Sequence, residues 1–279
     1  MSIKKCIITA AGLGTRFLPF TKSIAKEMLP IIDRPNIEYL IREAKNSGIE
    51  EVIIIVSKSK PEIEDYFKRN IELENILISD GKIKEANEIK EIAELVKIKF
   101  VLQEKPIGLA NALYVAKQEI NGEDFALILG DDLIYSDGVP ALKQLIDAYE
   151  KYDSNIIGVQ KVDHDKVNKY GIVAPKSDIK GSVFELSDLV EKPKIEDAPS
   201  DYAIIGRYII KNNLFNYIEK LKPGKNNEYQ LTDAFKMCLN DNNSICACVI
   251  DGKRFDIGDK KGFVSAIDFY YKLNYSEQL

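Results

Sequence analysis

A short apolar run that is followed at once by small residues constrains this chain more than any other feature. The run covers residues 6–9, and Ala10, Ala11, Gly12, Leu13 and Gly14 follow it. Such a run is typical of a buried strand, and a loop with little side-chain cover lets phosphates approach several backbone N–H groups. Arg16 adds a planar, permanent charge, and Lys26 adds a flexible one. The stretch predicts a nucleoside triphosphate site lined by Ala11, Gly12 and Gly14.

Two other interpretations of this loop compete. In the first, the glycines only allow a tight turn between a strand and a helix. The second is a dinucleotide-binding G-x-G-x-x-G loop, but Phe17 replaces its third glycine and Pro19 would break the helix that must begin there. A Walker-type loop is excluded because no Gly-Lys-Ser/Thr follows.

The segments that follow alternate between helical and strand periodicity. Apolar spacing predicts helices over residues 36–47, 139–149 and 261–274 and within the polar segment 58–97. Apolar runs predict strands over residues 51–56, 99–103, 125–129 and 155–159. Strand, helix and strand in this order imply a right-handed crossover and parallel pairing. We therefore predict an α/β fold, a Rossmann-like mixed, mostly parallel sheet with helices on both faces, as one domain over residues 1–279.

Two acids follow the predicted strand 125–129. Asp131 and Asp132 come directly after Gly130, at the strand end where ligands bind in open α/β sheets. Burying carboxylates there is costly unless a cation pairs with them. Asp131 is therefore a candidate Mg²⁺ ligand, whereas Asp132 could equally cap a following helix.

The overall charge and the cysteines exclude several classes of protein. A net charge of −5 argues against a general role on nucleic acids or membrane surfaces, and no apolar run is long enough for a membrane helix. The four cysteines form no disulfide framework, and a single histidine rules out the usual Cys/His metal spacings. Reduced thiols in a cytoplasmic protein are the expectation.

Several motifs together carry a resemblance to a known family. The chain contains G-L-G-T-R-F-L-P from Gly12, K-E-M-L-P from Lys26, V-E-K-P from Val190 and K-P-G-K-N-N-E from Lys222. This set resembles the sugar-nucleotide pyrophosphorylases, and most closely their bacterial UTP–glucose-1-phosphate uridylyltransferase branch, over nearly the whole chain. The resemblance implies the nucleotide-diphospho-sugar transferase fold and the formation of UDP-glucose and pyrophosphate from UTP and glucose 1-phosphate, with Mg²⁺ as cofactor. It also implies a homo-oligomer, a dimer or a tetramer, that binds no nucleic acid and no membrane.

The same resemblance assigns roles to further residues. It implies that Gln103 and Gly108 bind the base, that Gly171 and Glu191 contact the sugar, and that Lys192 binds the sugar phosphate. The aspartate of F-D-x-G, Asp256, is implied as the second metal ligand beside Asp131. Arg16 and Lys26 are then expected to stabilise the charge of the departing pyrophosphate. Sugar phosphate is ionised at neutral pH, so the reaction needs no general base.

Base preference is the point on which the motifs disagree. The segment G-L-A-N-A from Gly108 leans toward the thymidylyltransferase pattern G-L-A-Q-A, whereas A-P-S from Ala198 and K-P-G-K-N-N-E favour uridylyltransferases. A thymidylyltransferase or another sugar-1-phosphate nucleotidyltransferase therefore stays an alternative. A non-catalytic nucleotide-sugar sensor is a third hypothesis, which the complete set of charged residues disfavours.

Overall fold

The central element is a mixed β-sheet. The computed structural model describes residues 2–58, 60–224 and 227–275, so residues 225 and 226 of the K-P-G-K-N-N-E motif lie outside the described residues. Within these ranges the strands form a nine-stranded sheet in the order β5-β4-β1-β6-β11-β8-β12-β10-β9. The bounds of these strands, in chain order, are β1 Lys5–Thr9, β4 Glu51–Val56, β5 Lys97–Leu102, β6 Phe125–Leu129, β8 Asn155–Lys161, β9 Gly171–Pro175, β10 Val183–Glu191, β11 Tyr202–Ile210 and β12 Ile245–Val249.

The sheet combines a parallel part with an antiparallel part. Strands β5, β4, β1 and β6 pair in parallel, as do β8 and β12. Strand β11 runs antiparallel to both β6 and β8, and β10 runs antiparallel to β12 and β9. Two small ladders lie outside the sheet: β2 (Pro30–Ile31) with β3 (Arg34–Pro35), and β7 (Asp132–Tyr135) with β13 (Lys253–Asp256). The mixed α/β architecture is confirmed.

Helices cover both faces of the sheet, as predicted. Their bounds are α1 Asn36–Asn46, α2 Pro61–Tyr66, α3 Ile71–Ser79, α4 Ile83–Ala93, α5 Leu109–Val115, α6 Lys117–Ile120, α7 Ala141–Tyr152, α8 Phe215–Ile218, α9 Leu231–Asn240 and α10 Lys260–Tyr275. On one face, α1, α7 and α10 pack over Cys6 and Ile8 of β1. On the other face, α5, α8 and α9 pack over Ile7. The alternation along β1 therefore separates two hydrophobic layers.

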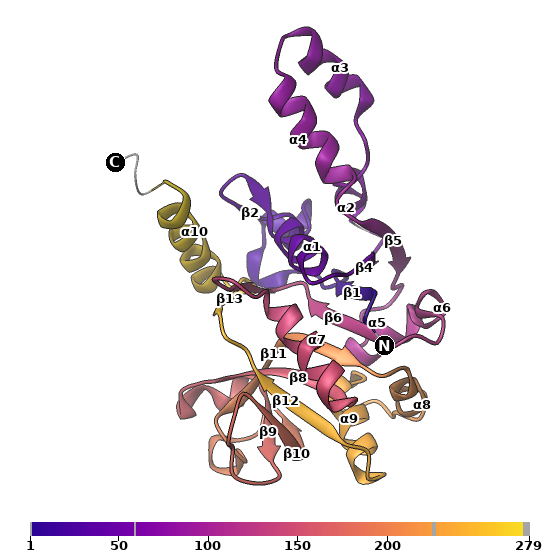
Figure 1. The fold of residues 1–279 in the computed structure, drawn as a ribbon, viewed down its shortest axis with the longest axis vertical. Helices are drawn as coiled ribbons and strands as arrows, with labels where there is room; N and C mark the ends of the chain where they lie inside the picture. The colour runs from indigo at the N-terminus through magenta and orange to yellow at the C-terminus, as the bar shows by residue number, and fades with distance from the viewer. Residues whose placement is uncertain (1, 59, 225–226, 276–279) are drawn as a thin grey trace.

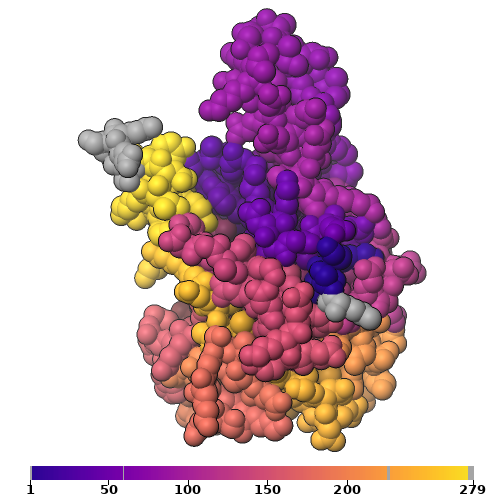
Figure 2. All heavy atoms as spheres, in the orientation of Figure 1, coloured from indigo at the N-terminus to yellow at the C-terminus, as the bar shows by residue number. Residues whose placement is uncertain are grey.

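The polar segment between β4 and β5 is helical, as predicted, and its described residues contain α2, α3 and α4. Figures 1 and 2 show α3 and α4 as a hairpin that projects from the body, with α2 at its root. Its exposed side chains include several large aliphatic ones, namely Ile71, Leu73, Ile76, Ile78 and Ile83. Pro61 occupies the first turn of α2, where its missing N–H costs nothing.

The ends of the other helices follow from local chemistry. Helix α7 begins at Ala141, two residues after the predicted start, because Pro140 precedes it with an extended backbone. In α10, Ala266 and Tyr270 are buried, whereas Tyr271 is 43% exposed, so only part of the predicted stripe belongs to the core. The four cysteines are buried free thiols. Among the described residues, no helix is both long and apolar enough to cross a bilayer.

Candidate active site

Two adjoining pockets lie where β1 and β6 end. The first, about 460 Å³, is bounded by the loop after β1 and by the segment around Gly108. The second, about 300 Å³, is bounded by residues from β9, β10, β11 and β13. Both are lined by Leu109, Leu129 and Asp131. A ligand in one pocket would therefore meet a ligand in the other at Asp131.

The loop after β1 gives the first pocket its open floor. Ala11, Gly12 and Gly14 all line this pocket, as predicted. The loop continues as short 3-10 turns, the first being η1 (Thr15–Phe17), rather than as a helix. At Gly12 an added Cβ would meet only the end of the Lys26 side chain, at 3.6 Å. No packing inside the protein therefore requires glycine there, and the bare backbone is available to a ligand.

Lys26 and Asp131 connect this loop to the end of β6. Lys26 Nζ donates a hydrogen bond of 2.7 Å to Asp131 Oδ2, and the lysine side chain is 15% exposed. Burial alone would lower the pKa of Lys26, but the nearby Asp131 and Glu27 carboxylates outweigh burial and raise it. Burial likewise acts to raise the pKa of Asp131, yet Lys26 and Arg16 bring it below its ordinary value. Both groups are therefore charged at neutral pH.

The second predicted metal ligand lies close to the first. A Cβ placed on Gly258 would lie 3.0 Å from Asp256 Oδ1 and 3.1 Å from Asp131 Oδ2. Gly258 N also donates to Asp256 Oδ1 at 3.0 Å, so the expected turn chemistry is present as well. Both carboxylates lie near Gly258 and line the second pocket, and such a pair suits a hard divalent cation that completes its shell with phosphate oxygens and water. Among the described residues, no group of three or more His, Cys, Asp or Glu side chains is arranged around a common metal position.

Asp132 has a structural partner that the sequence interpretation missed. It begins strand β7, so the hypothesis that it caps a helix is wrong. Its Oδ1 accepts a 2.5 Å hydrogen bond from Arg254 Nε, across the β7–β13 ladder. Burial raises the pKa of Asp132 to about 6, although Arg254 opposes that rise. The Arg254 guanidinium also lies 5.0 Å from the centre of the Tyr170 ring and 3.8 Å from Asp256 Oδ2.

The second pocket contains the predicted sugar-site residues. Glu191 and Lys192 line it and form an ion pair of 2.8 Å, with the lysine side chain 54% exposed. Lys192 has a left-handed backbone (φ 45°) and donates its N–H to Tyr170 O at 3.0 Å. A Cβ on Gly171 would lie 2.9 Å from Ile204 Cδ1 and 3.2 Å from Glu191 Oε2. The packing against Ile204 therefore already favours glycine here, and the missing side chain also leaves room beside the Glu191 carboxylate.

The predicted base-binding residues lie at the far end of the first pocket. Gln103 is buried, and its Nε2 donates to Asn111 Oδ1 at 2.9 Å. Gly108 has a φ of 111°, and an added Cβ would lie 2.5 Å from Tyr229 O. The Tyr229 backbone, which pairs with Ile107 and Ala110, therefore requires this glycine whether or not a base is bound.

Arg16 lies apart from the other loop residues. Its side chain is exposed and lines the second pocket rather than the first. No ion pair joins it to any residue in the described part of the chain. Its positive charge is close enough to Asp131 to help lower the pKa of that carboxyl group.

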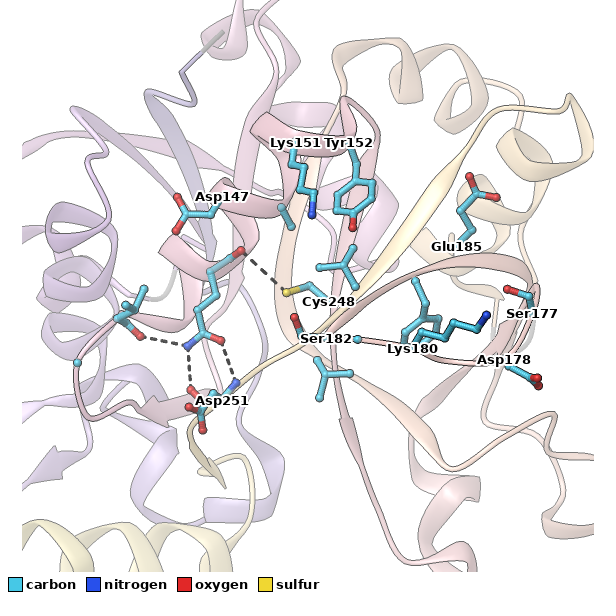
Figure 3. A pocket seen from close by; sticks show the side chains of 18 of the residues that line it. Asp147, Lys151, Tyr152, Ser177, Asp178, Lys180, Ser182, Glu185, Cys248 and Asp251 are labelled. Carbon is cyan, nitrogen blue, oxygen red and sulfur yellow. Dashed lines mark hydrogen bonds between the residues drawn. The ribbon is translucent and has the colours of Figure 1, made fainter.

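A larger cavity than either of these pockets lies elsewhere. It is an open groove of about 1240 Å³ between α7 and the turn before β10. Figure 3 shows Lys151 and Tyr152 of α7 on one side of it and Ser177, Asp178 and Lys180 of the turn on the other. None of the predicted site residues lines this groove. Size alone therefore does not mark the site, whereas converging charges and a bare loop do.

Comparisons with known proteins show what the chain as a whole is similar to. The chain matches the nucleotidyl transferase family over residues 5–272. It is 45% identical, over 265 residues, to the UTP–glucose-1-phosphate uridylyltransferase YngB of Bacillus subtilis (strain 168). The aligned region covers 95% of this chain and 88% of that protein.

Two solved structures are similar along almost their entire length. A UDP-glucose pyrophosphorylase complexed with UDP-glucose superimposes with a TM-score of 0.87 at 41% identity, covering 98% of this chain and 100% of that one. A UTP-bound pyrophosphorylase of the same kind from Acinetobacter baumannii gives a TM-score of 0.90 at 38% identity, covering 98% of this chain and 95% of that one.

Proposed function

Because the chain belongs to the nucleotidyl transferase family and, within it, to the UTP–glucose-1-phosphate uridylyltransferases, we propose that the two adjoining pockets form its active site. The enzyme makes UDP-glucose and pyrophosphate from UTP and α-D-glucose 1-phosphate. The observation that carries the assignment of the site is Asp131, which borders both the glycine-loop pocket and the pocket of Glu191 and Lys192. UTP occupies the first pocket and glucose 1-phosphate the second.

The reaction is an in-line displacement at phosphorus. A phosphate oxygen of glucose 1-phosphate forms a bond to the α-phosphorus of UTP, and the bond from that phosphorus to the bridging oxygen of pyrophosphate breaks. The attacking oxygen is already ionised, so no proton has to be removed. Catalysis therefore depends on positioning and on charge stabilisation. Lys192 orients the nucleophile, while Lys26 and Arg16 stabilise the charge on the departing pyrophosphate.

Mg²⁺ is the proposed cofactor, and Asp131 and Asp256 are its proposed ligands. The support is chemical: both carboxylates lie near Gly258 and line the second pocket, and carboxylate oxygens are the ligands that Mg²⁺ prefers. The bound ion would supply positive charge to the phosphate oxygens of both substrates. Lys26 meanwhile holds Asp131 Oδ2 in place through its 2.7 Å hydrogen bond.

Three broader expectations accompany this proposal. The whole chain is taken as one nucleotidyltransferase domain, which the sheet supports because β11 joins its parallel and antiparallel parts. The cytoplasm is the proposed compartment, in keeping with four buried free thiols. A homo-oligomer is also expected, and light scattering on the purified protein tests its size.

One measurement tests the function directly. Pyrophosphate release is followed with UTP and glucose 1-phosphate, and UDP-glucose is identified as the second product. Faster turnover with dTTP would instead indicate the thymidylyltransferase alternative. Tight binding of UDP-glucose without turnover would indicate a sensor.

A further inference from the structure

A buried lysine outside the predicted site lies directly behind the phosphate loop. Lys60 precedes α2, at the root of the projecting hairpin, and is 6% exposed. Its Nζ donates to Ala10 O at 2.6 Å and to Glu27 Oε2 at 2.7 Å. The neighbouring Glu62 accepts the Ala25 N–H at 2.6 Å. The start of α2 thus fixes both the loop and the turn that contains Lys26.

Charges alternate along a line from Lys60 to the active site. Lys60 pairs with Glu27, Lys26 Nζ lies 3.9 Å from Glu27 Oε1, and Lys26 in turn contacts Asp131. Glu27 is fully buried, and its Oε1 has no hydrogen-bond partner among the described residues. Burial raises the pKa of Glu27, while Lys60 and Lys26 oppose that rise. Of the cations in the described part of the chain that lower the pKa of Glu27, Lys26 would remain if Lys60 were removed.

We propose that Lys60 is a positioning residue for nucleotidyl transfer. By neutralising Glu27, it leaves the Lys26 ammonium free to contact Asp131 and the triphosphate. Its hydrogen bond to Ala10 O holds the ammonium in place beside Glu27. The inference rests on the proposed function, because Lys26 matters in this way only if the first pocket binds a triphosphate.

The decisive comparison is the effect of Lys60→Met in two backgrounds. In the wild-type background, Glu27 loses its partner and attracts Lys26, so kcat should fall about 10²-fold, the scale of an ångström-sized displacement of a catalytic group. The UTP affinity, measured by calorimetry without the second substrate, should fall as well, while the KM for glucose 1-phosphate stays within about twofold. In the Glu27→Gln background no charge needs neutralising, and Lys60→Met should change kcat and UTP affinity by less than about threefold.

The controls separate this role from simple support of the fold. Lys58→Met removes an exposed lysine, 74% accessible, two residues away, and should leave both quantities unchanged. If Lys60→Met alone does not fold, the two variants that contain Glu27→Gln still test the inference, because a difference between them larger than about threefold overturns it. Equal losses in both backgrounds would show that Lys60 acts only through Ala10 O, and no loss in either would show that it does nothing; both results overturn the inference. A wild-type enzyme that binds UTP but releases no pyrophosphate would overturn the proposed function and leave the affinity test of Lys60 intact.

Discussion

The two pockets of the site are built in different ways. In the glycine-loop pocket, Lys26 is 15% exposed and is held between Asp131 and Glu27. In the second pocket, Lys192 is 54% exposed, and its partner Glu191 is the preceding residue. The first arrangement joins segments from distant parts of the chain, whereas the second is local and open to solvent.

This difference indicates when each pocket takes its working form. Burying the charges of Lys26, Glu27 and Asp131 costs desolvation energy, and the ion pairs among these groups offset that cost. We therefore infer that their geometry is fixed before substrate binds. An exposed pair such as Glu191–Lys192 contributes only about 0–1 kcal/mol. Lys192 can therefore exchange its carboxylate partner for a sugar phosphate at little cost. The triphosphate pocket is preorganised, and substrate completes the other pocket.

The largest effect is expected at Asp131, the acidic residue that lines both pockets. Asp131→Asn removes the charge that pairs with Lys26 and the proposed metal ligand, so kcat should fall by at least about 10³-fold, at the upper end for one preorganised electrostatic group. Turnover should also stop in EDTA and return with added Mg²⁺. The measurement is pyrophosphate release, with circular dichroism to show that the fold is kept.

A matched acid tests whether this effect is specific. Asp178→Asn changes an exposed aspartate in the groove of Figure 3 and should leave kcat unchanged. If Asp131→Asn keeps most of its activity, or if EDTA has no effect, the metal assignment is wrong and the pockets do not share a metal ligand.

The next effect in size tests the open pocket. Lys192→Ala should raise the KM for glucose 1-phosphate and lower kcat, with a loss in kcat/KM of at least about 3 kcal/mol, because a charge-assisted contact and a preorganised donor are both removed. Calorimetry with UTP alone should show unchanged affinity, since the first pocket forms independently. Lys194→Ala, an exposed lysine two residues further on, is the control. A Lys192→Ala enzyme within a few-fold of wild type would leave Lys192 as a surface charge.

Base choice should show a smaller difference. If Gln103 binds the base as proposed, it contacts an edge that uracil and thymine share, so the thymine methyl and the ribose 2′-hydroxyl must separate UTP from dTTP. A methyl group contributes about 1–3 kcal/mol in a close-fitting pocket. We therefore expect UTP to be preferred, dTTP to be a weaker but measurable substrate, and CTP and the purine triphosphates to be poor. The kcat/KM values for the five triphosphates decide this, and a dTTP value above that of UTP would contradict the uridylyl assignment.

The sequence predicted those parts of the site that depend on local signals. The strands and the bare loop follow from periodicity and small residues within a few positions, and the pockets contain every predicted site residue. The proximity of Asp131 and Asp256 needed the family resemblance, because the β7–β13 ladder that aligns them joins distant segments. Lys60 carried no signal, since one lysine in a polar stretch is usually solvated and its partner Glu27 lies far away along the chain. Arg254 offered a weak signal: it lies two residues before Asp256, on the same face of one strand.

Arg254 lines the second pocket beside the acids and so tests how separate the two pockets are. Its guanidinium donates a hydrogen bond to Asp132, the neighbour of Asp131, and lies over the ring of Tyr170. The backbone carbonyl of Tyr170 in turn accepts the Lys192 N–H. Lysine could keep the charge beside Asp132, but it lacks the planar group that contacts the ring and the hydroxyl together.

We therefore expect Arg254→Lys to lower kcat/KM for glucose 1-phosphate about tenfold, or about 1.4 kcal/mol, while changing UTP affinity less than about twofold. Tyr170→Phe removes only the hydroxyl, which accepts from Arg254 Nη1 at 3.3 Å, and should cost less than about threefold. Because Arg254 acts through the loop that holds Lys192, its effect on the KM for glucose 1-phosphate should shrink when Lys192→Ala is already present. Full additivity of the two substitutions would mean that Arg254 acts on the carboxylates alone. An equal loss of UTP affinity would mean that the two pockets are organised as one.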